Sequence, residues 1–269
     1  MTLNFFYETI DDIAPKKLSD EYCAAYDAYD NSGILIDAQT DVQKALFSLD
    51  FSLAAVRKAI EEKADVIVTH HPAIYAKIGK ITRETETGNK IALCLKHGIS
   101  VISCHLNLDM AIGGVDECLC SGVVKASGGK EDVQSVAQPL PESDGGYGRA
   151  YRVGECKLQE LVEGLKKEFR SERVLFYGDP NATIKRVASF CGAGGGDEGI
   201  VDFAVQKRAD AIVSSDFKHH VLVAARENGL NVICLTHYAS ENYGFEKFYE
   251  KIRGRIEIPC VYHTDEELL

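Results

Sequence analysis

The sequence predicts an α/β fold made of two similar α/β units with mainly parallel sheets and a metal site between them. Segments with apolar residues at helical spacing alternate with short β-branched runs, an order typical of strand–helix–strand units. Two stretches of the second half also resemble stretches of the first. The length of 269 residues suits two modest domains. We expect one unit over residues 1–125 and a connecting segment with the second unit over 126–269, whose C-terminal part is free to return to the first unit.

The first unit is expected to contain a helix followed by a strand. Apolar residues recur at helical spacing over residues 53–60, and residues 66–68 form a short β-branched run suited to a buried parallel strand. The next helix should end near Gly98, because glycine favours the position just after a helix C-terminus. Residues 99–104 are expected to form the strand that follows.

The middle of the chain differs in composition from the helix–strand segments that precede it. Residues 126–151 are rich in Gly, Ser, Pro and acids, which indicates a connection or an edge hairpin between the two halves. Residues 157–169 have the pattern of an amphipathic helix. Residues 187–196 predict a strand that runs into a glycine-rich loop.

The second half repeats a scheme seen in the first. Residues 209–220, "ADAIVSSDFKHH", resemble residues 64–75, "ADVIVTHHPAIY". Residues 228–241, "NGLNVICLTHYASE", resemble residues 97–109, "HGISVISCHLNLD". Each copy reads as a strand, a polar loop, a helix, a second strand and a histidine at its end. Internal repetition explains the chain length, and coincidence stays open as the alternative because the similarity is short.

Composition narrows the class of protein. The formal net charge of −11 argues against a surface that grips nucleic acid, although bound cations could still recruit a small anion. Nine scattered cysteines, none in a CxxC pair, fit reduced thiols in the cytoplasm. The N-terminus lacks a basic signal-peptide region, and no apolar run approaches the ~20 residues of a membrane span. We therefore expect a soluble cytoplasmic protein with no membrane partner.

Most of the histidines fall at the ends of predicted strands, where ligands gather in open α/β sheets. These six are His70, His71, His105, His219, His220 and His237. Asp109 lies four residues after His105, and Glu241 lies four residues after His237. If a helical turn begins at each histidine, both side chains of a pair lie on one face. Imidazole and carboxylate are the usual ligands of zinc, iron or manganese.

The adjacent pair His70 and His71 suggests more than one ion. Neighbours on a strand point to opposite faces, but at a strand end the two rings could flank two metals, with Pro72 fixing the turn. The candidate ligands are His70, His71, His105, Asp109, His237 and Glu241. This set exceeds the needs of one catalytic zinc and suits a dinuclear centre with positions left for water.

The remaining polar residues can be explained by structural roles or solvent exposure as well as by function. Asp216 and His220 follow a predicted strand, where they could support the ligands, touch substrate or move protons, or simply cap a helix and face solvent. We name both as catalytic candidates. His219 is expected to be exposed, and His97 and His263 to be structural or exposed. Residues 192–199, "GAGGGDEG", lack the Walker lysine and the full dinucleotide-binding context, so we expect a turn that allows close backbone approach near the site and no nucleotide cofactor.

Taken in order, these segments resemble the NIF-three-like dinuclear-metal proteins, also labelled GTP cyclohydrolase 1 type 2 homologs. Residues 29–37, "YDNSGILID", are similar to the family's Trp-Asp-Asn-x-Gly-Leu segment, and residues 64–75 contain its His-His-Pro motif. "CHLNLD" (residues 104–109), "SSDFKHH" (214–220) and "THYASE" (236–241) resemble its His-x-Asn-x-Asp, Gly-Asp-x-x-x-His and His-x-x-x-Glu motifs.

The resemblance covers nearly the whole chain, with two departures. Tyr29 stands where the family has tryptophan, and Ser215 where it has glycine. The resemblance implies two similar α/β units, a two-metal site formed by the six candidate ligands, and a hexameric ring assembled as a trimer of dimers. The domain that some relatives carry in the middle does not fit in this chain.

Two classes of function follow. The first is a metal-dependent hydrolase of a nucleotide-like, phosphorylated or heterocyclic small molecule, with GTP ring opening as one case and phosphoester or amide hydrolysis equally compatible. The second is a metal carrier, metallochaperone or ring-shaped scaffold, which the lack of an obvious nucleotide-binding motif favours. Whether the protein is an enzyme stays open at this point, as does the identity of the two divalent ions: zinc, iron or manganese.

Overall fold

The structure is a computed structural model that describes residues 1–130, 132 and 134–269. The chain divides into two compact units. Unit 1 comprises Met1–Ala111, Leu140–Ser143 and Phe245–Asp265. Unit 2 comprises Ile112–Pro139, Asp144–Gly244 and Glu266–Leu269. Residues 131 and 133, within the expected connecting segment, lie outside the described part of the chain.

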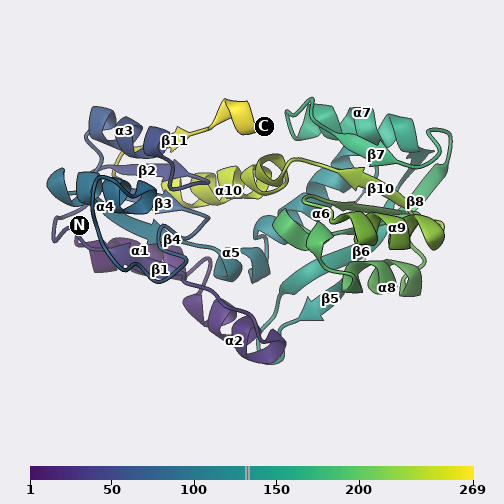
Figure 1. The fold of residues 1–269 in the computed structure, drawn as a ribbon, viewed down its shortest axis with the longest axis horizontal. Coiled ribbons are helices and arrows are strands. Elements are labelled where there is room, and N and C mark those ends of the chain that lie inside the picture. Colours follow the sequence, from purple (N-terminus) through teal and green to yellow (C-terminus); the bar gives the residue numbers. More distant parts are fainter. Residues whose placement is uncertain (131, 133) are drawn as a thin grey trace. The chain divides into compact units, whose positions relative to one another are not determined.

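Unit 1 contains a five-stranded sheet in the order β1-β4-β3-β2-β11 (Figure 1). Its strands are β1 (Gly33–Ile36), β2 (Ala45–Ser48), β3 (Val66–Thr69), β4 (Ser100–Ser103) and β11 (Cys260–His263). Its helices are α1 (Leu3–Asp11), α2 (Lys16–Tyr26), α3 (Leu53–Glu62), α4 (Glu86–Lys96), α5 (Leu106–Met110) and the part of α10 (His237–Arg253) from Phe245 on. All neighbouring strands are parallel except β1 and β4.

The core of unit 1 follows from its apolar pattern. Every residue of β2, β3 and β4 is buried, as expected for parallel strands covered on both faces. Ser52 begins α3 by accepting a hydrogen bond from the Ala55 N–H, and the buried side of that helix packs on the sheet. Gly98, with a φ of +69°, follows the end of α4 as predicted.

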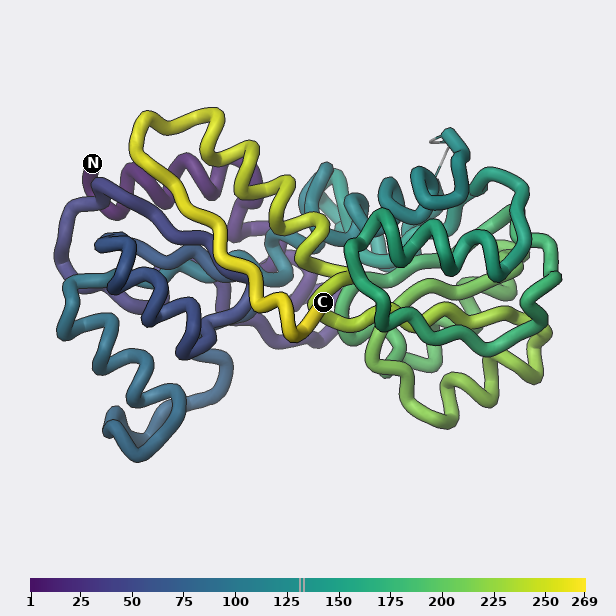
Figure 2. The backbone as a smooth tube through the Cα atoms, turned by 90° about the horizontal axis from the view of Figure 1, so that it is seen from above, coloured from purple at the N-terminus to yellow at the C-terminus, as the bar shows by residue number. Residues whose placement is uncertain are grey.

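The last strand of unit 1 comes from the far end of the chain. Figure 2 shows β11, in yellow, running beside β2 near the N-terminal part of the sequence. The pairing is parallel and joins Cys260–His263 to Ala45–Ser48. Unit 1 is therefore completed by residues from both ends of the sequence.

Unit 2 contains a six-stranded sheet in the order β5-β6-β8-β9-β10-β7. Its strands are β5 (Ser135–Pro139), β6 (Gly146–Lys157), β7 (Leu175–Tyr177), β8 (Thr183–Ser189), β9 (Ala211–Ser214) and β10 (Asn231–Cys234). Its helices are α6 (Val115–Ala126), α7 (Leu158–Glu168), α8 (Gly199–Gln206), α9 (His219–Glu227) and the start of α10, with the short turns η1 (Gly192–Gly196) and η2 (Glu266–Leu268).

The sheet of unit 2 is more mixed than the sequence predicts. Only β8, β9 and β10 are parallel to one another, and β5, β6 and β7 join antiparallel. At one edge, residues 135–157 form the hairpin β5–β6, which joins β8 antiparallel; at the other edge, β7 pairs antiparallel with β10. Antiparallel strands need only a short turn between them, whereas parallel strands need a longer crossover.

In both units, two neighbouring parallel strands end side by side. In unit 1, Thr69 at the end of β3 pairs with Ser103 at the end of β4. In unit 2, Ser214 at the end of β9 pairs with Cys234 at the end of β10. Each pair directly precedes histidine-containing segments, so the strand–helix–strand scheme predicted from the sequence is present in both halves. Among the described residues, no helix is both long and apolar enough to cross a bilayer.

Candidate metal centre

The adjacent histidines after β3 are held by different groups. His70 is buried, and its Nδ1 lies 2.7 Å from the carbonyl oxygen of Cys104. A carbonyl only accepts hydrogen bonds, so Nδ1 donates, and Nε2 of the neutral ring is the nitrogen that can bind a metal. His71 Nδ1 lies 2.7 Å from Asp50 Oδ1. The Thr69 hydroxyl donates to the His71 carbonyl over 2.8 Å, which fixes the backbone turn at the strand end.

His105 is fixed in the same way at the end of β4. Its Nδ1 lies 2.7 Å from Asp30 Oδ1, and its backbone N–H donates to the Ser32 hydroxyl over 3.0 Å. The expected helical turn follows directly, because His105 caps α5. Asp109 on that helix lies with its Oδ1 3.5 Å from His70 Nε2, so it reaches the histidine after the neighbouring strand.

Asp30 is the buried acceptor behind His105. Burial alone would raise the pKa of its carboxyl group, but the bond and charge of His105 and the hydroxyls of Ser19 and Ser32 outweigh burial. The pKa of Asp30 therefore lies well below its ordinary value. An ionised carboxylate at this position holds the His105 ring in one orientation.

In unit 1, three imidazoles converge. One ligand nitrogen of each of His70, His71 and His105 lies within 4.8 Å of those of the other two. The ring centroids are 5.0 to 5.9 Å apart. Each ring has its Nδ1 occupied by an acceptor, which leaves Nε2 for a metal. Three imidazoles with a nearby carboxylate form a donor set that suits zinc, iron or manganese.

In unit 2, His237 and Glu241 lie together on the first turn of α10. His237 Nε2 is 3.1 Å from Glu241 Oε2, as the four-residue spacing on a helix predicts. His237 Nδ1 lies 2.6 Å from Asp216 Oδ2. Asp216 has a left-handed backbone with a φ of +52°, which aspartate tolerates better than most residues. Unit 2 thus presents an imidazole and a carboxylate, with Asp216 orienting the imidazole.

The glycine-rich turn η1 lies against this pair, as expected for a close backbone approach. A Cβ on Gly192 would lie 2.1 Å from Glu241 Oε1 and 3.3 Å from His237 Nε2. Gly192 donates its N–H to the Ser240 hydroxyl over 3.2 Å and accepts a hydrogen bond from Ser215. Only glycine fits at position 192, and Ser215 helps to hold it there.

The remaining predicted histidines have partners outside the ligand set or face solvent. His220, on the first turn of α9, has its Nε2 3.3 Å from Glu198 Oε1, and both side chains are exposed. His219 and His97 are exposed, as expected. His263 lies in β11 with its Nε2 3.1 Å from Asp265, in agreement with a structural role.

Two residues that orient these candidates, Asp50 and Asp30, were missed at the level of sequence. Asp50 follows the end of β2, so a carboxylate after a further buried strand was an available signal. Asp30 belongs to the segment 29–37 that carries the family resemblance, but nothing in its spacing shows that it faces His105. The glycine-rich run predicted a close backbone approach near the site, but the particular contact of Gly192 with Glu241 depends on tertiary packing.

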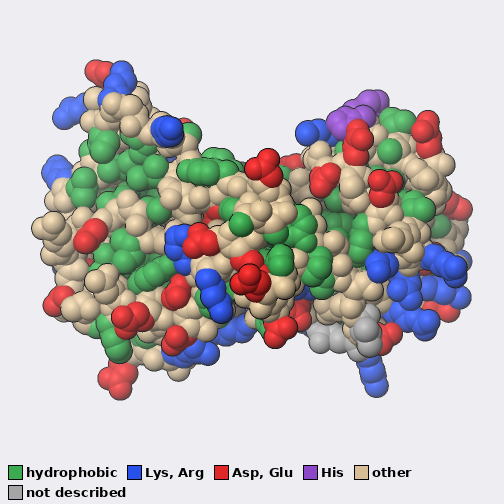
Figure 3. Space-filling view, turned by 90° about the horizontal axis from the view of Figure 1, so that it is seen from below, with side chains coloured by type: hydrophobic (Ala, Val, Ile, Leu, Met, Phe, Trp, Pro, Cys, Tyr) green, Lys and Arg blue, Asp and Glu red, His purple; other side chains and the backbone are tan. Residues whose placement is uncertain are grey.

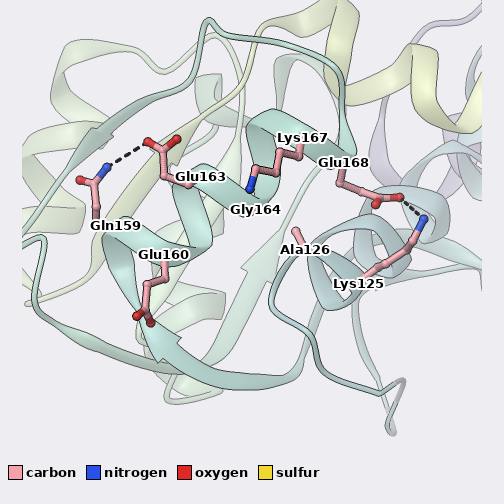
Figure 4. A pocket seen from close by; sticks show the side chains of 8 residues that line it. All are labelled: Lys125, Ala126, Gln159, Glu160, Glu163, Gly164, Lys167 and Glu168. Atoms are coloured by element: carbon pink, nitrogen blue, oxygen red, sulfur yellow. Dashed lines mark hydrogen bonds and ion pairs between the residues drawn. The ribbon is translucent and has the colours of Figure 1, made fainter.

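Unit 2 also contains a cavity of about 560 Å³ formed by α6 and α7 (Figure 4). Its lining residues are Lys125, Ala126, Gln159, Glu160, Glu163, Gly164, Lys167 and Glu168. Gly164 permits the close helix approach, because a Cβ there would lie 2.2 Å from the Ala126 carbonyl oxygen. Lys125 and Glu168 pair over 2.8 Å at its rim. None of the predicted site residues lines this cavity, which has the solvated, mixed charge of an ordinary surface.

Comparison with known proteins fixes the family. The family model described as Duf34/NIF3 (NGG1p interacting factor 3) matches residues 1–265. The chain belongs to the Duf34/NIF3 family. This assignment confirms the resemblance that the His-His-Pro and His-x-x-x-Glu segments indicate.

Relatives extend over the whole chain. A Clostridium perfringens protein named GTP cyclohydrolase 1 type 2 homolog is 29% identical over 269 residues, covering 99% of this chain and 97% of its own. A Methanocaldococcus jannaschii protein of the same name is 27% identical, covering 94% and 96%. The crystal structure of a Staphylococcus aureus hypothetical protein matches with a TM-score of 0.81 at 24% identity, covering 98% and 96%, which supports the NIF3 fold.

Proposed function

We propose that the protein is a dinuclear metal-dependent hydrolase of a nucleotide-like or phosphorylated small molecule. The convergence of His70, His71 and His105 in unit 1, each with its Nδ1 held by an acceptor, is the observation that carries the proposal. Clusters of imidazoles that are each oriented by a hydrogen bond at Nδ1 are typical of metal sites. Relatives named GTP cyclohydrolase 1 type 2 homolog support a nucleotide-like substrate.

The proposed centre binds two divalent ions, which are zinc, iron or manganese. The ligands that we propose are the six candidates named from the sequence: His70, His71, His105, Asp109, His237 and Glu241. Four imidazoles and two carboxylates give roughly three ligands per ion and leave positions for water. When bound, such ions lower the pKa of a coordinated water toward neutrality and polarise the bond under attack.

The chain's own residues position this chemistry. Asp30, Asp50 and Asp216 each accept from a histidine Nδ1, which fixes the ring and makes its other nitrogen a better ligand. We assign Asp216 this orienting role within the catalytic machinery. We assign His220 the transfer of a proton, with Glu198 as its carboxylate partner at 3.3 Å.

A metal carrier, metallochaperone or scaffold is the second candidate function. Its support is the accessibility of two ligands, since the side chains of His71 and His105 are 26% and 20% exposed. Exposed imidazoles can pass an ion to a partner, whereas a catalytic centre needs water exclusion around the reacting bond. Turnover separates these two functions.

The partners and location belong to the same proposal. Acidic side chains are spread over the face in Figure 3, with basic ones gathered mainly at its lower right, and the net charge of −11 favours a small molecule over nucleic acid. Nine free cysteines support a reducing compartment, and we propose the cytoplasm. The assembly that we propose is the hexameric trimer of dimers implied by the resemblance.

Elemental analysis of protein purified without chelators tests the metal centre. We expect about two ions per chain in the wild type, and loss of metal in His71→Ala, Asp109→Ala and Glu241→Ala without unfolding. His97→Ala is the matched control, because this exposed histidine belongs to neither ligand set. Full metal retention in the three ligand variants would refute the site.

A screen of metal-reconstituted protein against GTP and a panel of phosphoesters tests the reaction. Metal-dependent turnover that disappears in Asp109→Ala supports the hydrolase. If the protein binds two ions but turns over no member of the panel, the result would favour the carrier or scaffold function. His220→Gln should lower the turnover and flatten its pH profile while leaving the metal content unchanged, because His220 is assigned proton transfer and not ligation.

A further inference from the structure

Two exposed tyrosines lie beside the ligand set of unit 1. Tyr29 is 58% exposed and Tyr75 is 51% exposed, and their ring centroids are 5.3 Å apart at an interplanar angle of 75°. The Tyr75 ring also lies edge-on to His105, with centroids 6.3 Å apart and planes at 87°. Single exposed aromatics are ordinary, but a contacting pair next to a candidate metal ligand is a feature to explain.

Hydrogen bonds tie together the two segments that carry these rings. Asn31 donates from its side-chain amide to the Ile74 carbonyl over 2.5 Å, and the Tyr75 hydroxyl donates to the Tyr29 carbonyl over 3.4 Å. Asp30, the neighbour of Tyr29, accepts from the His105 ring. The segments are therefore linked to each other and to a ligand before any substrate binds. Such preorganisation lowers the entropic cost of binding.

The residues that follow Tyr75 are basic. Residues 76–84 carry Lys77, Lys80 and Arg83 against a single acid, and all three basic side chains are exposed. Within the described part of the chain, none of the three forms an ion pair. In a protein of net charge −11, a segment of opposite sign attracts anions.

We propose that Tyr29 and Tyr75 form a stacking site for the planar heteroaromatic ring of a small anionic ligand, whose charged group is attracted by the adjacent basic segment 76–84. This inference rests on the proposed function and names the substrate class of that centre. Both tyrosines are more than half exposed, so ring surface stays accessible to a planar partner. Contact between Tyr75 and His105 puts that partner next to the metal ligands of unit 1.

Binding of matched probes tests the stacking site apart from turnover. Guanosine and adenosine 5′-monophosphates contain a planar ring, and ribose 5-phosphate has the same phosphate without one. Calorimetric titration of the full chain, metal-loaded and chelator-treated, measures the affinity of each probe. Metal content and oligomeric state are measured in the same samples.

We expect Tyr29→Ala and Tyr75→Ala to weaken monophosphate binding about five- to tenfold and to leave ribose 5-phosphate within about twofold. Tyr29→Phe should keep the affinity, because the ring does the stacking and the Tyr29 hydroxyl takes no part in the argument. Tyr177→Ala, at another exposed tyrosine, is the matched control and should change nothing. Lys77→Gln with Lys80→Gln should weaken all three probes and reduce their salt dependence.

Several outcomes would overturn the stacking site. These are equal loss for ring-containing and ring-free probes, absence of ring-dependent binding in the wild type, and a change of oligomeric state in the alanine variants with ligand affinity unchanged. The last result would make the tyrosines a contact between copies of the chain. Failure of the hydrolase shows instead as missing turnover, and ring-selective binding can persist in that case.

Discussion

Each candidate histidine has one ring nitrogen hydrogen-bonded to an acceptor and the other available to bind a metal. A carbonyl oxygen does this for His70, and carboxylates do it for His71, His105 and His237. A fixed ring loses less freedom when a metal binds, and a carboxylate partner makes the imidazole more basic. The orienting aspartates should therefore control affinity for the metal without touching it.

Asp50→Asn tests this at His71. The amide keeps the shape but removes the negative charge from the 2.7 Å contact, so metal affinity should fall about 10- to 100-fold. Competition titration with a chromophoric chelator measures the change. Asp41→Asn, an exposed position nearby in the sequence, is the control. Unchanged affinity in Asp50→Asn would show that His71 does not bind metal through Nε2.

Asp30 makes a prediction about pH. Its pKa is depressed in the folded protein, so its contribution to stability is present above the ordinary value of 3.8 and is lost as pH falls toward the folded value. In metal-free protein at pH 7, Asp30→Asn should lower the free energy of unfolding by about 2 kcal/mol, the scale of charged hydrogen bonds. Urea unfolding at pH 7 and pH 3 should show the difference shrinking at acid pH. A constant difference would contradict the assignment.

At the scale of elements, the glycine-rich turn η1 places backbone where a side chain would collide with a candidate ligand. Gly192→Ala should lower the free energy of unfolding by about 1–2 kcal/mol, because Gly192 has a left-handed backbone conformation. The added methyl group should also displace Glu241. Gly229→Ala is a matched control, because Gly229 has a φ of +75° and nothing within 4 Å of an added Cβ. We expect both variants to be destabilised in urea and only Gly192→Ala to lose metal. Equal metal content in the two variants would contradict the role of Gly192.

Local sequence patterns predicted much at this scale. The helix–strand pair α3–β3, the glycine after α4 and the helical turns that begin at His105 and His237 all follow from periodicity and spacing. Contacts between residues far apart in the sequence could not be predicted in this way. Asp30 and Asp50 reach their histidines through tertiary packing. The composition of residues 126–151 allowed an edge hairpin, but the antiparallel pairings of β6 with β8 and of β7 with β10 join segments that no local pattern connects.

For the whole molecule, metal binding and folding should be linked. An ion that binds only the native state stabilises it by about 2.7 kcal/mol when present at 100 times its Kd. Chelation should therefore lower the Tm of the wild type, and added zinc or manganese should restore it in a concentration-dependent way. Asp109→Ala should lose most of this shift. A full shift in that variant, measured by differential scanning calorimetry, would place the stabilising ion elsewhere.

The pairing of β11 with β2 has a consequence for synthesis of the protein. During synthesis β2 has an unpaired edge for a long time, because its partner strand β11 is made much later than β2 itself. Completion of the first sheet must therefore wait until Cys260–His263 have been made, and this non-local step should be slow compared with local helix formation. A nascent chain halted before Cys260 would expose β2, a strand with three apolar residues out of four, and would need a chaperone to keep it from aggregating.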